Sequence, residues 1–169
     1  APGLQGANRT GRPFTGDFAG YLLYQTLYRF GFANSPDPLN AEGNPNPTLQ
    51  LQNCRITNAV KCLPPANKPT PAEIRQCNAY LADELHSLTP GTAVLALGQI
   101  AHQAVLRASG IKQSACRFAH GAHYALAAHG SLLDLQLWNS YHCSRYNTQT
   151  RRLTPAMFEA VFADITANH

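Results

Sequence analysis

A glycine-rich, basic segment near the start of the sequence, residues 8–20, combines residue types that suit chemistry on a nucleotide. Its glycines let the backbone turn sharply and approach a ligand closely. Arg9 and Arg12 suit the binding of a phosphate group. Phe14 offers a flat apolar face on which a ring can stack, and Asp17 offers a carboxylate that can act on the stacked group. The segment therefore favours a nucleotide or a phosphate-bearing polymer as ligand.

An ordinary surface loop is the alternative interpretation of this segment. The segment contains neither the G-x-G-x-x-G pattern nor the Walker A lysine. Asp17 is also well placed to cap the helix predicted to follow it, and Phe14 suits an apolar core. These residues alone leave both interpretations open.

Further candidates lie in two other polar loops. The amide of Asn67 carries a donor and an acceptor, which match a base edge that has both. His142 can hydrogen-bond a carbonyl oxygen that gains negative charge while a glycosidic bond breaks. Each also has an ordinary explanation, because asparagine is common in proline-rich turns and a single histidine is usually a surface or capping residue. Lys68, Ser144 and Arg145 flank these two positions.

Helical and strand patterns alternate along the chain. Apolar spacing, proline and the capping residues Thr70 and Thr154 predict four helices, and short apolar runs predict three strands. Residues 34–47, with four prolines and four asparagines, predict an irregular connection. The expected helices span residues 18–32, 71–88, 99–109 and 154–167, and the expected strands span 54–62, 92–97 and part of 132–141.

This alternation predicts an α/β fold, a three-layer αβα sandwich with a mostly parallel central sheet. A length of 169 residues suits a single domain over residues 1–169. Loops gather at the carboxyl edge of parallel strands. We therefore expect the loops that start near Ala1, Leu63, Gly98 and His142 to converge on one site.

Composition adds weaker indications about partners and compartment. Thirteen Lys and Arg against nine Asp and Glu give a net charge of +4, which permits a polyanionic partner. The five cysteines, an odd number without a signal peptide, favour a reducing cytoplasm over a secreted disulfide scaffold. We expect no membrane association, because no apolar run approaches the length of a membrane-spanning helix.

Several motifs together closely resemble those of the family 5 (type B) uracil-DNA glycosylases, over almost the whole chain. The sister family 4 enzymes share the Gly-Arg-Pro-Phe core but lack Asn8-Arg9-Thr10 and the N-T-Q-T tail. The motifs are A-P-G followed by N-R-T-G-R-P-F-T-G-D-x-A-G, C-L-P-P-A-N-K-P-T-P, A-L-G-Q-I-A, H-G-A-H-Y and S-Y-H-C-S-R-Y-N-T-Q-T.

The resemblance implies a monofunctional glycosylase that flips uracil, and possible further substrates such as hypoxanthine and xanthine, out of double-stranded DNA. It assigns Asp17 a place near the sugar, Phe14 a stacking role on the base and Asn67 the reading of uracil. His142 is then expected beside the leaving base, and Gly3 at the substrate. The residues expected to contact DNA are Arg9, Arg12, Lys68, Ser144, Arg145, Asn147 and Gln149.

The resemblance also implies a [4Fe-4S] cluster. Cys62 and Cys77, at the spacing C-(x)14-C, resemble the family's second ligand pair. The sequence has no C-x-x-C for the first pair, so we expect either a fragment that starts after this pair and the first strand, or a protein without the cluster. Cys54, Cys116 and Cys143 are expected to be simple thiols.

Two other function classes stay open at the level of sequence. One is a nucleic-acid-binding member of the same fold that has lost catalysis, and the other is a hydrolase of free nucleotides. Asn and Ala substitutions at Asp17 and His142 discriminate the first alternative from a glycosylase, and competition by duplex DNA discriminates the second. The family is typical of bacteria, and we expect a monomer.

Overall fold

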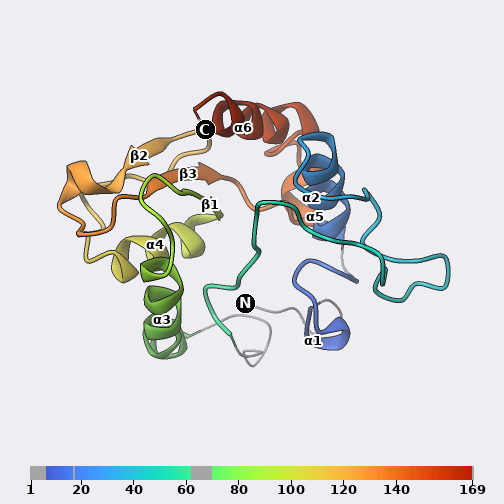
Figure 1. Ribbon diagram of the computed structural model, residues 1–169, viewed down its shortest axis with the longest axis horizontal. Coiled ribbons are helices and arrows are strands. Elements are labelled where there is room, and N and C mark those ends of the chain that lie inside the picture. Colours follow the sequence, from blue (N-terminus) through green and yellow to red (C-terminus); the bar gives the residue numbers. More distant parts are fainter. Residues whose placement is uncertain (1–6, 17, 62–69, 169) are drawn as a thin grey trace.

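A three-stranded sheet lies between two layers of helices in the computed structural model (Figure 1). The structure describes residues 7–16, 18–61 and 70–168. The strands β1 (Ala93–Leu97), β2 (His123–Ala125) and β3 (Gln136–Ser140) are ordered β1-β3-β2. β1 runs parallel to β3, and β2 runs antiparallel to it. The predicted α/β class is confirmed, and the described part of the sheet is mixed.

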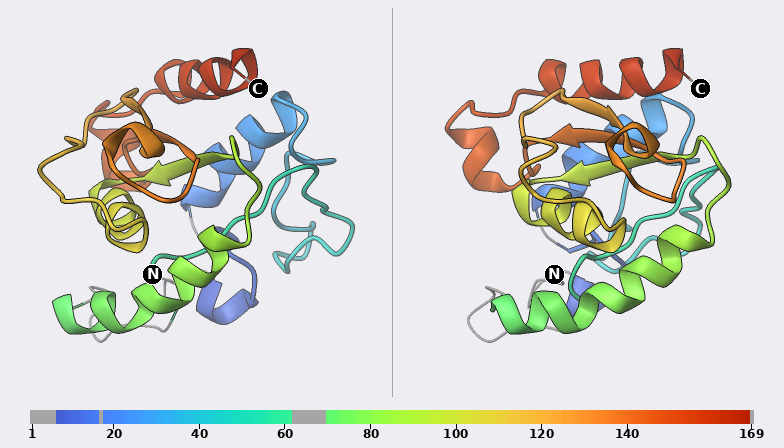
Figure 2. Two further views of the ribbon diagram at one scale, coloured as in Figure 1. Left: turned by 60° about the vertical axis from the view of Figure 1, so that its left-hand side comes forward. Right: turned by 90° about the vertical axis from the view of Figure 1, so that its left-hand side faces the viewer.

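Helices cover both faces of this sheet (Figure 2). On one face α4 (Gln99–Ala108) packs against β1, and α3 (Pro71–His86) packs against α4. On the other face α6 (Pro155–Ala167) packs against β3, and α2 (Phe18–Arg29) packs against α6.

The alternation of side chains along β3 divides the apolar interior into two parts. Leu137 is fully buried in the cluster shared with α3 and α4. Its neighbour Trp138 is buried against Val161 and Ile165 of α6. Successive side chains of a strand point to opposite faces, so this one strand anchors both helical layers.

The helix boundaries follow the capping residues that the sequence predicts. The Thr70 side chain accepts a hydrogen bond from the Glu73 backbone, and the Glu73 side chain accepts one from the Thr70 backbone, which completes a capping box. Thr154 caps α6 by accepting a hydrogen bond from the backbone N–H of Met157. Helix α2 ends at Arg29, three residues before the expected boundary, because Gly31 takes a φ of 78° and turns the chain. None of the described helices has the length and apolar character needed to cross a membrane.

The prediction of a strand over residues 54–62 is wrong for the part that the structure describes, 54–61. This segment has no regular secondary structure, and its backbone joins none of the described strands, although Val60 is fully buried. It is held instead by side chains, since Lys61 Nζ lies 2.6 Å from Glu84 Oε1 on α3. Although burial opposes its charge, hydrogen bonds from Lys61 and Thr57 hold the pKa of Glu84 below its usual value. Apolar alternation here reflects one-sided packing rather than strand pairing.

Strand β2 was not predicted. It has three residues, its side chains are exposed or half-buried, and it lacks the alternating pattern that marks a strand. It is recruited by pairing with β3, through His123 opposite Trp138. The His123 ring also stacks on the Trp138 ring, with centroids 4.0 Å apart.

Candidate active site

Two rings from distant parts of the sequence meet beyond the carboxyl end of β3. The ring of Phe14 lies 5.7 Å from that of His142, centroid to centroid, at an interplanar angle of 30°. Both side chains are half-buried. The loop at Gly98, after β1, reaches the same edge because its backbone N–H donates to the carbonyl of Ser140 at 2.8 Å. The predicted convergence is therefore confirmed for the described loops that carry Phe14, Gly98 and His142, whereas the start of the first loop near Ala1 and the loop near Leu63 lie outside the described residues.

The loop that carries Phe14 is held against α2. The Tyr24 hydroxyl donates to the Pro13 carbonyl at 3.0 Å, and the buried Thr15 hydroxyl donates to the Arg12 carbonyl at 2.7 Å. A Cβ added to Gly20 would lie 1.9 Å from the carbonyl oxygen of Phe14, so only glycine allows this approach. Phe14 itself has a φ of 56°, an uncommon conformation for a bulky residue. The fixed loop presents the Phe14 ring to His142.

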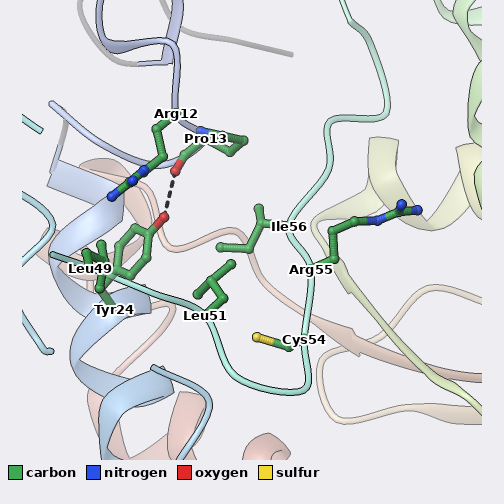
Figure 3. Close-up of a pocket in the computed structure, with 8 residues that line it drawn as sticks. All are labelled: Arg12, Pro13, Tyr24, Leu49, Leu51, Cys54, Arg55 and Ile56. Carbon is green, nitrogen blue, oxygen red and sulfur yellow. Dashed lines mark hydrogen bonds between the residues drawn. The ribbon is translucent and has the colours of Figure 1, made fainter. Parts of the chain in front are cut away.

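A hollow of about 280 Å³ lies behind this loop (Figure 3). Tyr24 and Pro13 join across it through their hydrogen bond, whereas Arg55 extends away from the other side chains. Arg12 Nη1 donates to the Asn46 carbonyl at 2.9 Å. Arg12, which the sequence predicts to contact DNA, therefore also joins its own loop to the loop of Asn46. The hollow lies on the side of the loop where Pro13 bonds to Tyr24 of α2. It is lined by Arg12, Pro13, Tyr24, Leu49, Leu51, Cys54, Arg55 and Ile56.

A second glycine lies against His142. Gly98, between β1 and α4, has a φ of 96°. An added Cβ would lie 3.3 Å from the Cβ of His142, which is tighter than ordinary van der Waals contact. Gly20 and Gly98 thus provide the space in which the loops of Phe14 and His142 come together.

The loop after His142 forms the short helix α5 (Arg145–Gln149). The Ser144 side chain caps it by accepting from the Asn147 N–H, and Asn147 Nδ2 donates to the His142 carbonyl at 2.8 Å. Ser144 and Asn147 therefore shape the loop. The side chains of Arg9, Arg145 and Gln149 are exposed to solvent.

A stack of three side chains supports the backbone just before His142, and the sequence interpretation assigned none of them a role. The His120 ring stacks on the Tyr141 ring at 5.1 Å, and the Arg152 guanidinium lies 4.6 Å from the centre of the same ring. The Tyr141 N–H donates to His120 Nδ1 at 3.3 Å, so Nδ1 acts as an acceptor. The H-G-A-H-Y motif contains His120, but nothing in that motif identifies Tyr141 as its partner.

We expect the His120 contact to make folding stability depend on pH. Burial lowers the pKa of His120 below its usual 6.5. The unfolded chain then takes up a proton near pH 6.5 that the folded protein resists, so stability is full above this pH and falls as pH decreases through the folded pKa. A His120→Asn variant, which keeps an acceptor oxygen, should lose this part of the pH dependence. Urea unfolding at several pH values from about 7 to 5 measures the free energy of unfolding of both proteins. If the free energy changed with pH equally in wild type and His120→Asn, the pH dependence would not come from His120.

Comparison with known proteins places this arrangement in a family. The family model described as "Uracil DNA glycosylase superfamily" matches residues 1–166. A type-5 uracil-DNA glycosylase of Thermus thermophilus is 46% identical over 164 residues, which cover 97% of this chain and 70% of the relative. The chain belongs to the type-5 uracil-DNA glycosylases. The corresponding protein of Mycobacterium leprae is 42% identical over 97% of this chain and 69% of its own length.

The comparison also separates this type-5 family member from the sister group. A type-4 uracil-DNA glycosylase of Archaeoglobus fulgidus is 34% identical over 94 residues, which cover 55% of this chain and 38% of the relative. The type-5 relatives match nearly the whole chain, as the motifs at both ends of the sequence predict.

Several predicted site residues lie outside the described residues of this type-5 family member. Cys77 is described, and it is a free, buried cysteine on α3. Within the described ranges no group of three or more potential metal-ligating side chains occurs. The predicted residues outside those ranges are Gly3, Asp17, Cys62, Asn67 and Lys68.

The other three cysteines of this type-5 family member are packed in its apolar interior. Cys116 is buried in the cluster of α3 and α4, whereas Cys143 and Cys54 pack in the cluster around α2. Burial raises the pKa of the Cys54 and Cys116 thiols, which favours their protonated form.

Proposed function

We propose that this type-5 family member is a monofunctional DNA glycosylase that removes uracil and related deaminated bases from duplex DNA in base excision repair. The observation that carries the proposal is the meeting of Phe14 and His142, 5.7 Å between ring centroids, at the sheet edge where this family's motifs lie. A base taken out of the DNA stack needs a ring to stack on and a donor at its carbonyl edge. These two side chains are suited to those two tasks.

Substrate recognition follows from the same arrangement. Phe14 stacks on the extruded base, and the family resemblance assigns Asn67 the reading of its polar edge and Gly3 a place at the substrate. Exposed Arg9 and Arg145 contact the phosphates of the DNA. Lys68, Arg12 and Gln149 complete the DNA-binding surface, whereas Ser144 and Asn147 act by shaping the loop.

The chemical step breaks the bond between the base nitrogen and C1′ of the sugar. The bonding electron pair leaves with uracil, whose carbonyl oxygen gains negative charge and accepts a hydrogen bond from His142. Asp17 stabilises the positive charge that develops on the sugar. A water oxygen then bonds to C1′ and its proton is lost to solvent, which leaves an abasic site and an intact strand.

Cys62 and Cys77 are proposed as two of the four thiolate ligands that would hold a [4Fe-4S] cluster. Buried Cys77 fits one ligand position on α3. Cys54, Cys116 and Cys143 do not fit the same site, because they pack in the interior around other elements. The base-release step described above uses no cluster. We further propose a monomer that acts on DNA in a bacterial cytoplasm.

Single-turnover assays test the proposed activity. Wild-type protein in excess should release free uracil from a duplex with one uracil opposite guanine, and leave an abasic strand that breaks only on alkali treatment. The matched thymine duplex should release no base. Binding without release would favour a binding module instead, and hydrolysis of free deoxyuridine monophosphate that duplex DNA does not inhibit would favour a nucleotide hydrolase.

A further inference from the structure

A groove lies between α2 and the chain that runs from α5 to α6, with a volume of about 560 Å³. Figure 1 shows α2 and α5 next to each other. Along the chain, one wall begins at Phe18, four residues after Phe14, and the other wall begins at Thr148, six residues after His142. One wall consists of Phe18, Tyr21, Leu22 and Gln25, and the other of Thr148, Arg151, Leu153, Thr154 and Pro155.

The groove exposes aromatic side chains on one stripe of α2. Phe18 and Tyr21 are three residues apart, which places them on the same helix face, and they are 45% and 46% exposed. Neither ring is needed to fill the core on the other side of α2, where Leu23 and Tyr24 are buried. Two neighbouring exposed rings therefore form a flat apolar wall that is open to a ligand.

The charge of the groove restricts what can occupy it. Arg151 lines the groove, and none of the nine described residues that line it is acidic. Exposed Arg145 and Arg152 lie on the same stretch of chain, from α5 to the start of α6. The nearby carboxylate of Glu159 is already paired with Arg29 at 2.7 Å. Aromatic rings beside arginines that form no ion pair among the described residues suit the strand of a nucleic acid, whose sugars and bases pack on rings and whose phosphates pair with arginine.

The backbone of Arg151 supports a role for its side chain. Arg151 has a φ of 56°, a left-handed conformation that glycine or asparagine adopts at lower cost. This conformation is fixed by the hydrogen bonds from the Arg151 N–H to the Thr148 carbonyl and from the Leu153 N–H to the Asn147 carbonyl. The fold thus holds an arginine at a turn position that does not favour one, and this arginine lines the groove.

We propose that this groove binds the damaged DNA strand beside the extruded nucleotide. The deoxyribose faces of the strand pack on Phe18 and Tyr21, and a phosphate pairs with Arg151. The proposal rests on the proposed glycosylase function, because it places the strand that leads into the active site. It extends the DNA contact from α5 onto α2, which none of the sequence motifs indicates.

Fluorescence anisotropy tests the proposal with a duplex that contains 2′-fluoro-deoxyuridine, whose fluorine suppresses base release. Tyr21→Ala should weaken binding about tenfold, as the loss of an aromatic contact to a strand does. Arg151→Gln should weaken binding severalfold and reduce the salt dependence of log Kd by about one unit. Tyr28→Ala is the matched control, since Tyr28 is 51% exposed on the same helix but does not line the groove, and it should bind like wild type.

Shortening the DNA locates the contact. Removing nucleotides flanking the uracil on one side should weaken wild-type binding, and the same removal should change the binding of Tyr21→Ala much less. Equal affinities for wild type and both groove variants, with wild-type uracil release intact, would overturn the groove proposal and leave the glycosylase function standing. A change of oligomeric state without a change in affinity would also overturn it. Absence of uracil release from wild type would instead count against the proposed function.

Discussion

Replacing His142 by Ala should slow the single-turnover release of uracil by about 100- to 1000-fold, which is the usual cost of removing one donor to a developing oxyanion. The expected size follows from the position of His142 beside the Phe14 ring, because under the proposed function a base stacked on Phe14 would present its carbonyl edge to His142. Rates are measured with protein in excess over a uracil-containing duplex. Affinity for the same duplex should change little, because most protein–DNA contacts go to the phosphate backbone.

His86→Ala is the matched control for this variant. His86 is an exposed histidine on α3, and its Nδ1 contacts only the Ala82 carbonyl one turn earlier in the same helix among the described bonds. It should release uracil at the wild-type rate. An unchanged rate in His142→Ala, or an equal loss in both variants, would show that His142 is not the donor.

Gly20→Ala should destabilise the protein and lower the rate of uracil release by about 100-fold, the effect expected of a misplacement near 1 Å. In an open helix the same change would stabilise by about 1 kcal/mol, because alanine is the better helix former. Here an added Cβ meets the Phe14 carbonyl at 1.9 Å, so the loop must move away from α2. Thermal unfolding together with single-turnover rates measures both effects. A stabilised, fully active variant would contradict the close approach.

Gly98→Ala and Gly110→Ala form a matched pair that tests whether the loop of His142 also needs a glycine beside it. Both glycines have positive φ, 96° and 73°, and they flank the two ends of α4. An added Cβ at Gly98 lies 3.3 Å from the His142 Cβ, whereas one at Gly110 meets nothing within 4 Å. Both variants carry backbone strain, but only Gly98→Ala should slow uracil release beyond its effect on stability.

The sequence predicts the framework of this site because local chemistry determines it. Thr70 and Thr154 mark helix starts through side-chain hydrogen bonds to their own helices. The carboxyl ends of parallel strands share one edge, which is why the loops of Gly98 and His142 were expected to meet. Resemblance to the family motifs then adds the roles proposed for Phe14 and His142.

The other contacts at the site depend on how loops fold back in three dimensions, which one sequence does not reveal. Gly20 follows Phe14 by only six positions, but the 1.9 Å approach exists because the loop folds back on α2. His120 stacks on Tyr141 through the pairing of β2 with β3, and β2 has no pattern of its own. Arg12, predicted to contact DNA, also bonds the Asn46 carbonyl because an irregular loop returns to it.

A double-mutant cycle on Phe14 and His142 tests the central claim, that these two residues form one base-binding pocket. Single-turnover uracil release is measured for wild type, Phe14→Leu, His142→Ala and the double variant. If both side chains hold the same extruded base, the losses should be non-additive, and the double variant should be little slower than the worse single variant. Strictly additive losses, or no loss in Phe14→Leu, would contradict a shared pocket at the edge of this sheet.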